Sequence, residues 1–168
     1  MNWKTATKLN WGIVLLFGGG FALAAGFKES GLSAWVAEGM RGLGSVPPVF
    51  QVTGTCAVMT TLTEFTSNTA TTQIALPLLA SLANAIQVNP LLLMIPATLS
   101  ASCAFMMPVA TPPNAIVFGS GEIRMGDMIK AGIVLNLVGI VLIAALMFIW
   151  GLSVFAIGPA LPPLWLAP

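Results

Sequence analysis

Residues 47–86 read PPVFQVTGTCAVMTTLTEFTSNTATTQIALPLLASLANAI, and this stretch decides the fold. Two apolar segments, one ending near Leu62 and one beginning near Ala70, flank the polar cluster TEFTSNT of residues 63–69. Each segment is marginal in length for crossing the roughly 30 Å of a bilayer's hydrocarbon core. Backbone that turns at membrane depth is tolerated only where it faces protein or water. The pattern therefore predicts a re-entrant helical hairpin with a polar tip inside the membrane.

The composition of the whole chain agrees with a membrane location. Of the 168 residues, 57% are hydrophobic and 7% are charged, and the mean hydropathy is +0.96. The apolar residues form long blocks, which is typical of helices that satisfy their own backbone in lipid. We therefore expect an all-α integral membrane protein in contact with the lipid bilayer.

Charge and residue types argue against two other function classes. A net charge of +1 leaves no clustered basic surface, so nucleic acid is not an expected partner. The chain contains no histidine, the commonest metal ligand and general base, so an enzyme is not expected either.

Three further segments are predicted around the hairpin. A first transmembrane helix covers about residues 8–27, and its glycine triplet at 18–20 should let another helix approach closely. Helical spacing of apolar residues in 29–43 indicates a short helix in the membrane interface. The last apolar helix spans about residues 131–157.

A broken helix is predicted after Pro90. The apolar run reaches Met107, is interrupted at residues 108–114, PVATPPN, and resumes at 115–119. Three prolines in six residues prevent a regular helix, because proline lacks an amide donor and clashes with the preceding turn. The chain then divides into residues 1–45, with a transmembrane and an interfacial helix, 46–119, with the hairpin and the broken helix, and 120–168, with a cytoplasmic loop and the final helix.

Basic residues predict the orientation in the membrane. Four of them share one side in this topology, and two lie on the other side, where Glu29 and Glu38 offset them. The four are Lys4, Lys8, Arg124 and Lys130, and the two are Lys28 and Arg41. The positive-inside bias then places the amino terminus in the cytoplasm and Pro168 outside, in a multi-pass protein of the cell (inner) membrane, with Trp165 as an interfacial anchor.

Two polar features carry the expected chemistry: Ser67-Asn68-Thr69 at the hairpin tip, and residues 110–114, ATPPN, at the helix break. Hydroxyls, carboxamides and freed carbonyls are hard oxygen donors that can replace the hydration shell of sodium. Helix amino termini and side-chain donors can bind a carboxylate. The two features together predict a site for a cation and an anion.

These motifs resemble the divalent anion/sodium symporter family, which transports dicarboxylates, citrate or sulfate with sodium and carries a Ser-Asn-Thr triplet at the tip of each of two inverted hairpins. The resemblance covers nearly the whole chain and implies one inverted-repeat half, the carboxy-terminal half. It also implies an elevator-like movement of the hairpin and broken helix against a fixed scaffold.

The resemblance implies roles for individual residues. Sodium would be bound by Thr63, Ser67, Asn68 and the carbonyl of Ala110, and the substrate by Asn68, Thr69, Thr111 and Pro112. For any one hydroxyl, the alternative is a bond to the carbonyl one turn back. Glu64, the acid nearest the middle of the apolar sequence, is either functional or a structural hydrogen-bond anchor for the hairpin tip, and the anchor is favoured.

Only one Ser-Asn-Thr triplet occurs in the chain. We therefore expect part of a sodium-coupled symporter for di- or tricarboxylates such as succinate, malate or citrate, incomplete without an amino-terminal half in the same reading frame or in a separate chain. The complete transporter is expected to be a homodimer. The alternative is a structural or assembly subunit of a membrane complex that transports nothing.

Overall fold

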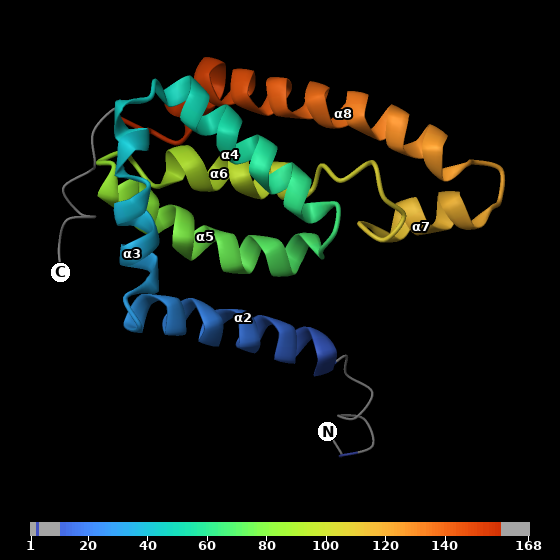
Figure 1. The fold of residues 1–168 in the computed structure, drawn as a ribbon, viewed down its shortest axis with the longest axis horizontal. Helices are drawn as coiled ribbons and strands as arrows, with labels where there is room; N and C mark the ends of the chain where they lie inside the picture. The colour runs from blue at the N-terminus through green and yellow to red at the C-terminus, as the bar shows by residue number, and fades with distance from the viewer. Residues whose placement is uncertain (1–2, 4–10, 159–168) are drawn as a thin grey trace.

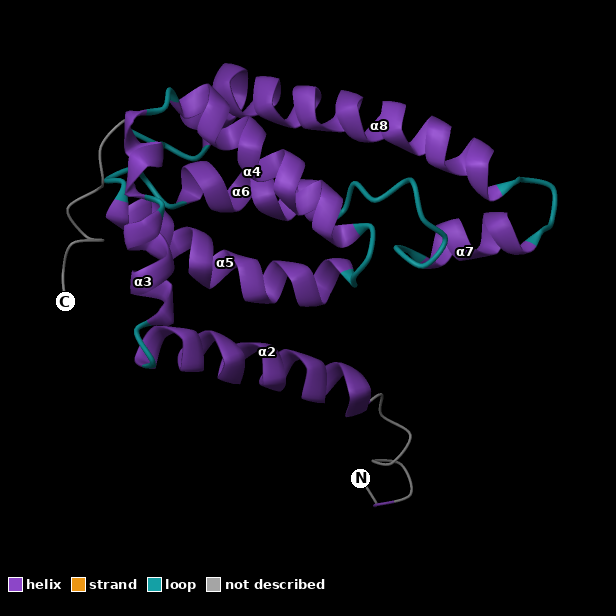
Figure 2. Ribbon diagram, viewed as in Figure 1, coloured by secondary structure: helices purple, strands orange, loops and turns teal. Residues whose placement is uncertain are grey.

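The computed structural model describes Trp3 and residues 11–158 of the chain. Every regular element among these described residues is a helix, as Figure 2 shows, so the all-α prediction is confirmed for this part. The elements are α2 Trp11–Glu29, α3 Leu32–Gly39, a 3₁₀ turn Arg41–Ser45, α4 Pro48–Thr63, α5 Asn68–Ala85, α6 Leu91–Ala101, α7 Pro112–Gly119, α8 Met125–Leu146, a π-helical turn Met147–Gly151 and α9 Leu152–Val154. The orienting residues Lys4 and Lys8, and the predicted anchor Trp165, lie outside the described residues.

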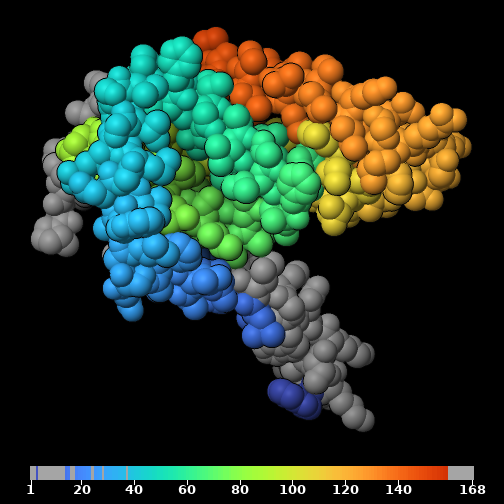
Figure 3. All heavy atoms as spheres, in the orientation of Figure 1, coloured from blue at the N-terminus to red at the C-terminus, as the bar shows by residue number. Residues whose placement is uncertain are grey.

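The hairpin formed by α4 and α5 lies at the centre of the packing (Figure 1). α4 contacts α6 and α8, while α5 contacts α6, α2 and α3. Buried apolar side chains join α4, α5, α6 and α8 in three clusters, centred on Val52 and Cys56, on Leu82 and Leu93, and on Met59 with Ala97. In the space-filling view, α7 and the start of α8, in yellow and orange, project beyond this packed group (Figure 3). The hairpin tip at residues 64–67 faces toward this projecting end (Figure 1).

The arms of the hairpin begin and end close to the predicted positions. α4 begins at Pro48, where a missing amide hydrogen costs nothing because the first turn has no intrahelical acceptor for it. It ends at Thr63, and α5 begins at Asn68 after a short turn. The polar cluster therefore forms the tip, as expected from its position between two apolar segments.

The break after α6 differs from the prediction in length. The apolar run was expected to stay helical to Met107, yet α6 ends at Ala101 and residues 102–111 have no helical structure. α7 then begins at Pro112, two residues before the end of the interruption expected at 108–114. Proline suits the first position of a helix, and Thr111 caps this helix.

The last helix begins earlier than predicted, at Met125 instead of about residue 131. Asp127 lies in its first turn, where a carboxylate is stabilised by the positive end of the helix dipole. The continuous helix Met125–Val154 has 30 residues and a mean hydropathy of 2.8, and it alone among the described helices is long and apolar enough to cross a bilayer. Lys130 is therefore an exposed residue of this helix, and not of the loop to which the sequence assigned it.

The glycine triplet on α2 behaves in part as predicted. Gly20 is buried, and a Cβ there would collide with the side chain of Gln73 on α5, so the two helices do approach closely. A Cβ at Gly18 or Gly19 would meet open space. Only one glycine of the three therefore lies at this contact. Gly31, at φ +75°, lets the chain turn from α2 into α3, which runs across the ends of α2 and α5 (Figure 1).

Candidate functional site

Thr63 and Asn68 lie on either side of the hairpin tip and are in direct contact. The hydroxyl of Thr63, a fully buried residue, is within hydrogen-bond distance of Asn68 Oδ1 and of the carbonyl oxygen of Ala101, the latter at 2.8 Å. One hydroxyl proton cannot serve two acceptors at once. Three oxygen atoms, from α4, α5 and the end of α6, therefore meet around a single proton. Such a set of hard oxygen donors suits a small cation.

Three other threonines of the hairpin make a local bond instead, whereas Thr60, like Thr63, bonds across to α6, at 3.4 Å from the carbonyl of Ser100. Thr61, Thr66 and Thr72 each donate to the carbonyl four residues earlier, at 2.8, 2.7 and 2.7 Å. That bond is the local alternative available to any hydroxyl in a helix. Thr63 instead bonds across to Ala101, 38 residues away. The hydroxyl at position 63 is thus directed into the junction of three helices.

The rest of the Ser-Asn-Thr triplet forms the exposed start of α5. Ser67 is the residue that precedes the helix, and its side chain makes no capping bond. Its carbonyl accepts the amide of Thr71 at 2.9 Å. Ser67 and Thr69 are exposed, while Asn68 is half-buried. Ser67 is therefore next to Asn68 in sequence, but its hydroxyl takes no part in the contact of Thr63 with Asn68 and Ala101.

Asn68 and Thr69 line a groove of about 400 Å³ between α2, α5 and α6. Its wall combines hydroxyl and carboxamide groups with apolar side chains, and the remaining lining residues are Phe21, Thr72, Gln73, Leu76, Pro77, Thr98 and Ser102. Within the described part of the chain, neither polar atom of the Gln73 carboxamide has a hydrogen-bond partner. Thr111 and Pro112 do not line this groove, so it contains only two of the four residues expected to bind substrate.

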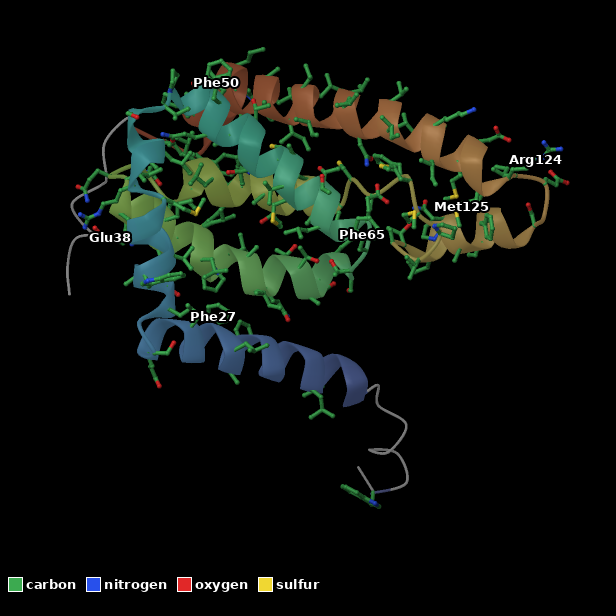
Figure 4. The ribbon with its side chains drawn as sticks, viewed as in Figure 1. Phe27, Glu38, Phe50, Phe65, Arg124 and Met125 are labelled. Atoms are coloured by element: carbon green, nitrogen blue, oxygen red, sulfur yellow. The ribbon has the colours of Figure 1, made fainter. Side chains whose placement is uncertain are left out.

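Glu64 is only 1% exposed, and its carboxylate accepts from four N–H donors. Oε1 accepts from the amides of Phe105 at 2.9 Å and Met106 at 3.0 Å, and from Asn136 Nδ2 at 2.7 Å. Oε2 accepts from the amides of Met106 at 3.1 Å and Met107 at 2.9 Å. Its neighbour Phe65, labelled beside the hairpin tip in Figure 4, is 68% exposed.

These contacts give Glu64 the geometry of an anchor, which was the favoured interpretation from sequence. Glu64 lies at the hairpin tip and holds the segment after α6, so it anchors these two parts of the chain to each other. Because the carboxylate takes up the amides of residues 105–107, these amides are not available for helical bonds to earlier carbonyls. This long-range contact explains why the helix ends at Ala101, although the residues up to Met107 are apolar.

A second side chain holds the carbonyls of the same segment. Asn114, on α7, donates from Nδ2 to the carbonyls of Ala104 at 2.8 Å and Met107 at 3.0 Å. Its own amide donates to Thr111 Oγ1 at 3.4 Å, so Thr111 serves as the cap of α7. Ala110 is 7% exposed, and its amide donates to the carbonyl of Met107.

The structure thus divides the predicted site residues into two groups. Thr63 and Asn68 touch each other, and Ser67 and Thr69 flank Asn68. Ala110, Thr111 and Pro112 lie where the segment after α6 leads into α7, and no hydrogen bond of the described residues joins them directly to Asn68. Two contributors were not foreseen, the carbonyl of Ala101 and the carboxamide of Asn136; Asn114 belongs to the predicted break but was given no individual role. Asn136 has a detectable signal, because a lone carboxamide in an apolar helix is costly unless it is bonded.

Comparison with known proteins identifies the family of the chain. Residues 1–157 match the family described as the sodium:sulfate symporter transmembrane region. The chain is 51% identical over 156 residues to solute carrier family 13 member 2 of Oryctolagus cuniculus, and 51% identical over 156 residues to the Na(+)/citrate cotransporter of Rattus norvegicus. It is 47% identical over 159 residues to the Na(+)/dicarboxylate cotransporter 3 of Rattus norvegicus.

These alignments cover 92–94% of the chain but only 26–27% of each relative. The chain therefore spans about a quarter of the length of the curated relatives it matches. The matched region includes the hairpin, the segment after α6 and α8, which are the elements that build the junction around Glu64. The expected resemblance is confirmed, and the chain belongs to the family of the sodium:sulfate symporter transmembrane region.

Proposed function

We propose that the chain is the part of a sodium-coupled di- or tricarboxylate transporter that binds one sodium ion and one end of the substrate. The observation that carries the proposal is the meeting of the Thr63 hydroxyl, Asn68 Oδ1 and the Ala101 carbonyl at the hairpin tip. Neutral hydroxyl, carboxamide and carbonyl oxygens at broken helices are the usual ligands of co-transported sodium. Ser67 and the Ala110 carbonyl would complete the shell of the ion.

The substrate carboxylate would bind at the start of α5. Asn68 and Thr69 lie in its first turn, where unpaired amides and the helix dipole favour an anion, and both line the groove beside α2. Thr111 and Pro112, at the start of α7, would approach the same anion from the other side of the junction. Asn68 is then shared by both ligands, because its carbonyl can bind the cation while its NH₂ group binds the carboxylate.

The hairpin is proposed to be re-entrant. At 1.5 Å per residue, α4 with 16 residues is about 24 Å long, which is short of the roughly 30 Å of a hydrocarbon core. The turn between α4 and α5 also carries the polar groups of the site, which lipid could not satisfy. Helix α8 would cross fully, with the Arg124 side and the amino terminus in the cytoplasm.

Sodium-dependent uptake of labelled succinate tests the proposed function. The chain would be produced with the amino-terminal half that carries the other Ser-Asn-Thr triplet, either fused to it or co-expressed. We expect uptake that needs both halves and sodium. If neither the fusion nor the pair transports, while both reach the membrane folded, the chain is better interpreted as an assembly subunit.

Asn68 variants of that transporter test the site. Asn68→Asp keeps an oxygen for sodium but replaces the NH₂ donor with a negative charge, so substrate binding should be lost more severely than sodium binding. Asn68→Ala should weaken both. The matched control is Asn84→Ala, which changes an exposed residue near the other end of α5 and should bind both ligands normally. Unchanged sodium and dicarboxylate affinities in Asn68→Ala would refute the assignment.

Labelling of single cysteines in intact cells tests the topology. A cysteine introduced near Arg124 should react with a membrane-impermeant reagent only after the cells are opened. Reaction from outside the intact cell would reverse the proposed orientation.

A further inference from the structure

Helix α8 presents two buried residues, Gly132 and Asn136, to the segment that follows α6. They are one helical turn apart and therefore lie on the same face. A Cβ on Gly132 would lie 2.6 Å from Met106 Cα and 2.6 Å from the carbonyl oxygen of Phe105. Since these atoms belong to the backbone, they cannot move aside as a flexible side chain would. The absence of a side chain at position 132 is what lets α8 reach the segment.

Asn136 reaches the same segment through Glu64. Its Nδ2 donates to Glu64 Oε1 at 2.7 Å, the shortest of the five bonds at this carboxylate. Asn136 is 6% exposed, and its Oδ1 has no hydrogen-bond partner among the described residues. An apolar side chain would fill the same space without the energetic cost of an unpaired buried oxygen. The bond to Glu64 is the polar interaction that offsets it.

Glu64 in turn connects the two groups of proposed site residues. It directly follows Thr63, whose hydroxyl contacts Asn68, and it binds the amides of residues 105–107. That segment continues to Ala110 through the turn that closes on the Met107 carbonyl. The side of Glu64 that is not occupied by backbone amides faces α8. A shift of α8 at this point would therefore move both halves of the site relative to each other.

We propose that Gly132 and Asn136 are positioning residues, through which α8 sets the distance between the hairpin tip and the Ala110 segment and so tunes sodium binding. The inference rests on the proposed function, because the property that it changes is the sodium affinity of that site. Neither residue belongs to the proposed ligands of sodium or substrate. Their effect passes through Glu64 and the backbone of residues 105–107.

Asn136→Asp tests the proposal in the complete transporter. The change is nearly isosteric, but it replaces the donor with a second carboxylate against Glu64. The half-saturating sodium concentration for succinate uptake should rise about tenfold or more, the effect of losing one hydrogen bond to a charged group. The maximal uptake rate per transporter at the cell surface should change far less. An unchanged sodium dependence would overturn the proposal.

The double variant Glu64→Gln with Asn136→Asp exchanges the donor and the acceptor, and so separates an effect on positioning from damage to the fold. In a Glu64→Gln background, the new amide can donate to the carboxylate of Asn136→Asp. The same Asn136→Asp change should then shift the half-saturating sodium concentration by less than about threefold. If Asn136→Asp shifts the half-saturating sodium concentration in the Glu64→Gln background as much as it does alone, its effect does not pass through Glu64 and the proposal is wrong.

Two glycines in the middle of α8, Gly132 and Gly139, provide a matched comparison. Gly132→Ala places a methyl group against backbone, whereas at Gly139 the same methyl group would make ordinary contacts of 3.7–3.8 Å with Cys103. Gly132→Ala should raise the half-saturating sodium concentration, and Gly139→Ala should leave it unchanged. Equal behaviour of the two variants would overturn the proposal.

A measurement that needs no transport distinguishes failure of the positioning role from failure of the proposed function. Alkylation of the half-buried Cys103, measured by mass spectrometry of its peptide, reports on the segment directly. It should become about tenfold faster in Asn136→Asp, because the segment opens more often. An unchanged alkylation rate refutes the positioning role even if uptake is normal. Absence of sodium-dependent uptake in the wild-type assembly refutes the proposed function instead.

Discussion

Replacing Glu64 by Gln should destabilise the protein measurably while keeping the shape of the side chain. Its two oxygens accept from three backbone amides and from Asn136, and Met106 is shared between them. With the Gln amide on the Oε2 side, the amide of Met107 loses its acceptor. With the Gln amide on the Oε1 side, Phe105 loses its acceptor, and Asn136 can turn its unpaired oxygen toward the new donor. Either orientation leaves one part-buried backbone amide unpaired.

The expected cost follows from these contacts. One orphaned buried amide costs about 1–3 kcal/mol, and the remaining bonds lose their charge assistance. Removing a buried charge returns part of this energy because less desolvation is needed. We therefore expect a net loss of about 2–4 kcal/mol, equivalent to a decrease in Tm of about 5–15 °C for a chain of this size.

Thermal unfolding of the detergent-purified protein, followed by fluorescence-detected size exclusion, measures this loss. The control is Glu38→Gln, the same chemical change at an exposed residue whose ion pair with Arg41, at 2.9 Å, is open to solvent. Exposed pairs contribute less than about 1 kcal/mol, so the Tm of this variant should stay close to wild type. If Glu64→Gln unfolds at the same temperature as Glu38→Gln, the carboxylate does not hold residues 105–107, and the anchor interpretation fails.

Two further variants address the same packing. Asn114→Leu should lower the Tm of the purified protein, because the carbonyls of Ala104 and Met107 lose a shared donor; an unchanged Tm would show that Asn114 does not hold the segment. Gly20→Ala should be tolerated with less than about 1 kcal/mol of destabilisation, because Gln73 is flexible and its carboxamide has no bond to lose. A large decrease in Tm for Gly20→Ala would mean that Gln73 cannot move aside.

The hairpin and the polar groups at its tip were predictable because they depend on local patterns. Apolar segments on either side of a polar cluster place two helices and a tip, and the observed α4 and α5 begin and end within a few residues of the expected positions. The Ser-Asn-Thr triplet is visible in the sequence as soon as the tip is placed. Contact between Thr63 and Asn68 across that tip follows from their separation of five residues.

The segment after α6 was not predictable in the same way. Its residues are apolar and helix-compatible as far as Met107, and the reason that they leave the helix lies about 40 residues earlier, at Glu64. The start of α8 was also misplaced, because the charged residues around Asp127 suggest a loop when read by hydropathy alone. The helix dipole makes the same carboxylate favourable in a first turn.

The amino-acid sequence by itself determined that this is a helical membrane protein with a polar hairpin tip and a proline-rich break, since hydropathy, proline chemistry and the triplet act over a few residues. Only the tertiary structure decided which carbonyl joins Thr63, which amides Glu64 binds, and why Gly132 and Asn136 face them. The physical reason is that a buried carboxylate takes its partners from whatever backbone the packing brings within hydrogen-bond distance, and that distance is set by helix contacts between residues far apart in the chain.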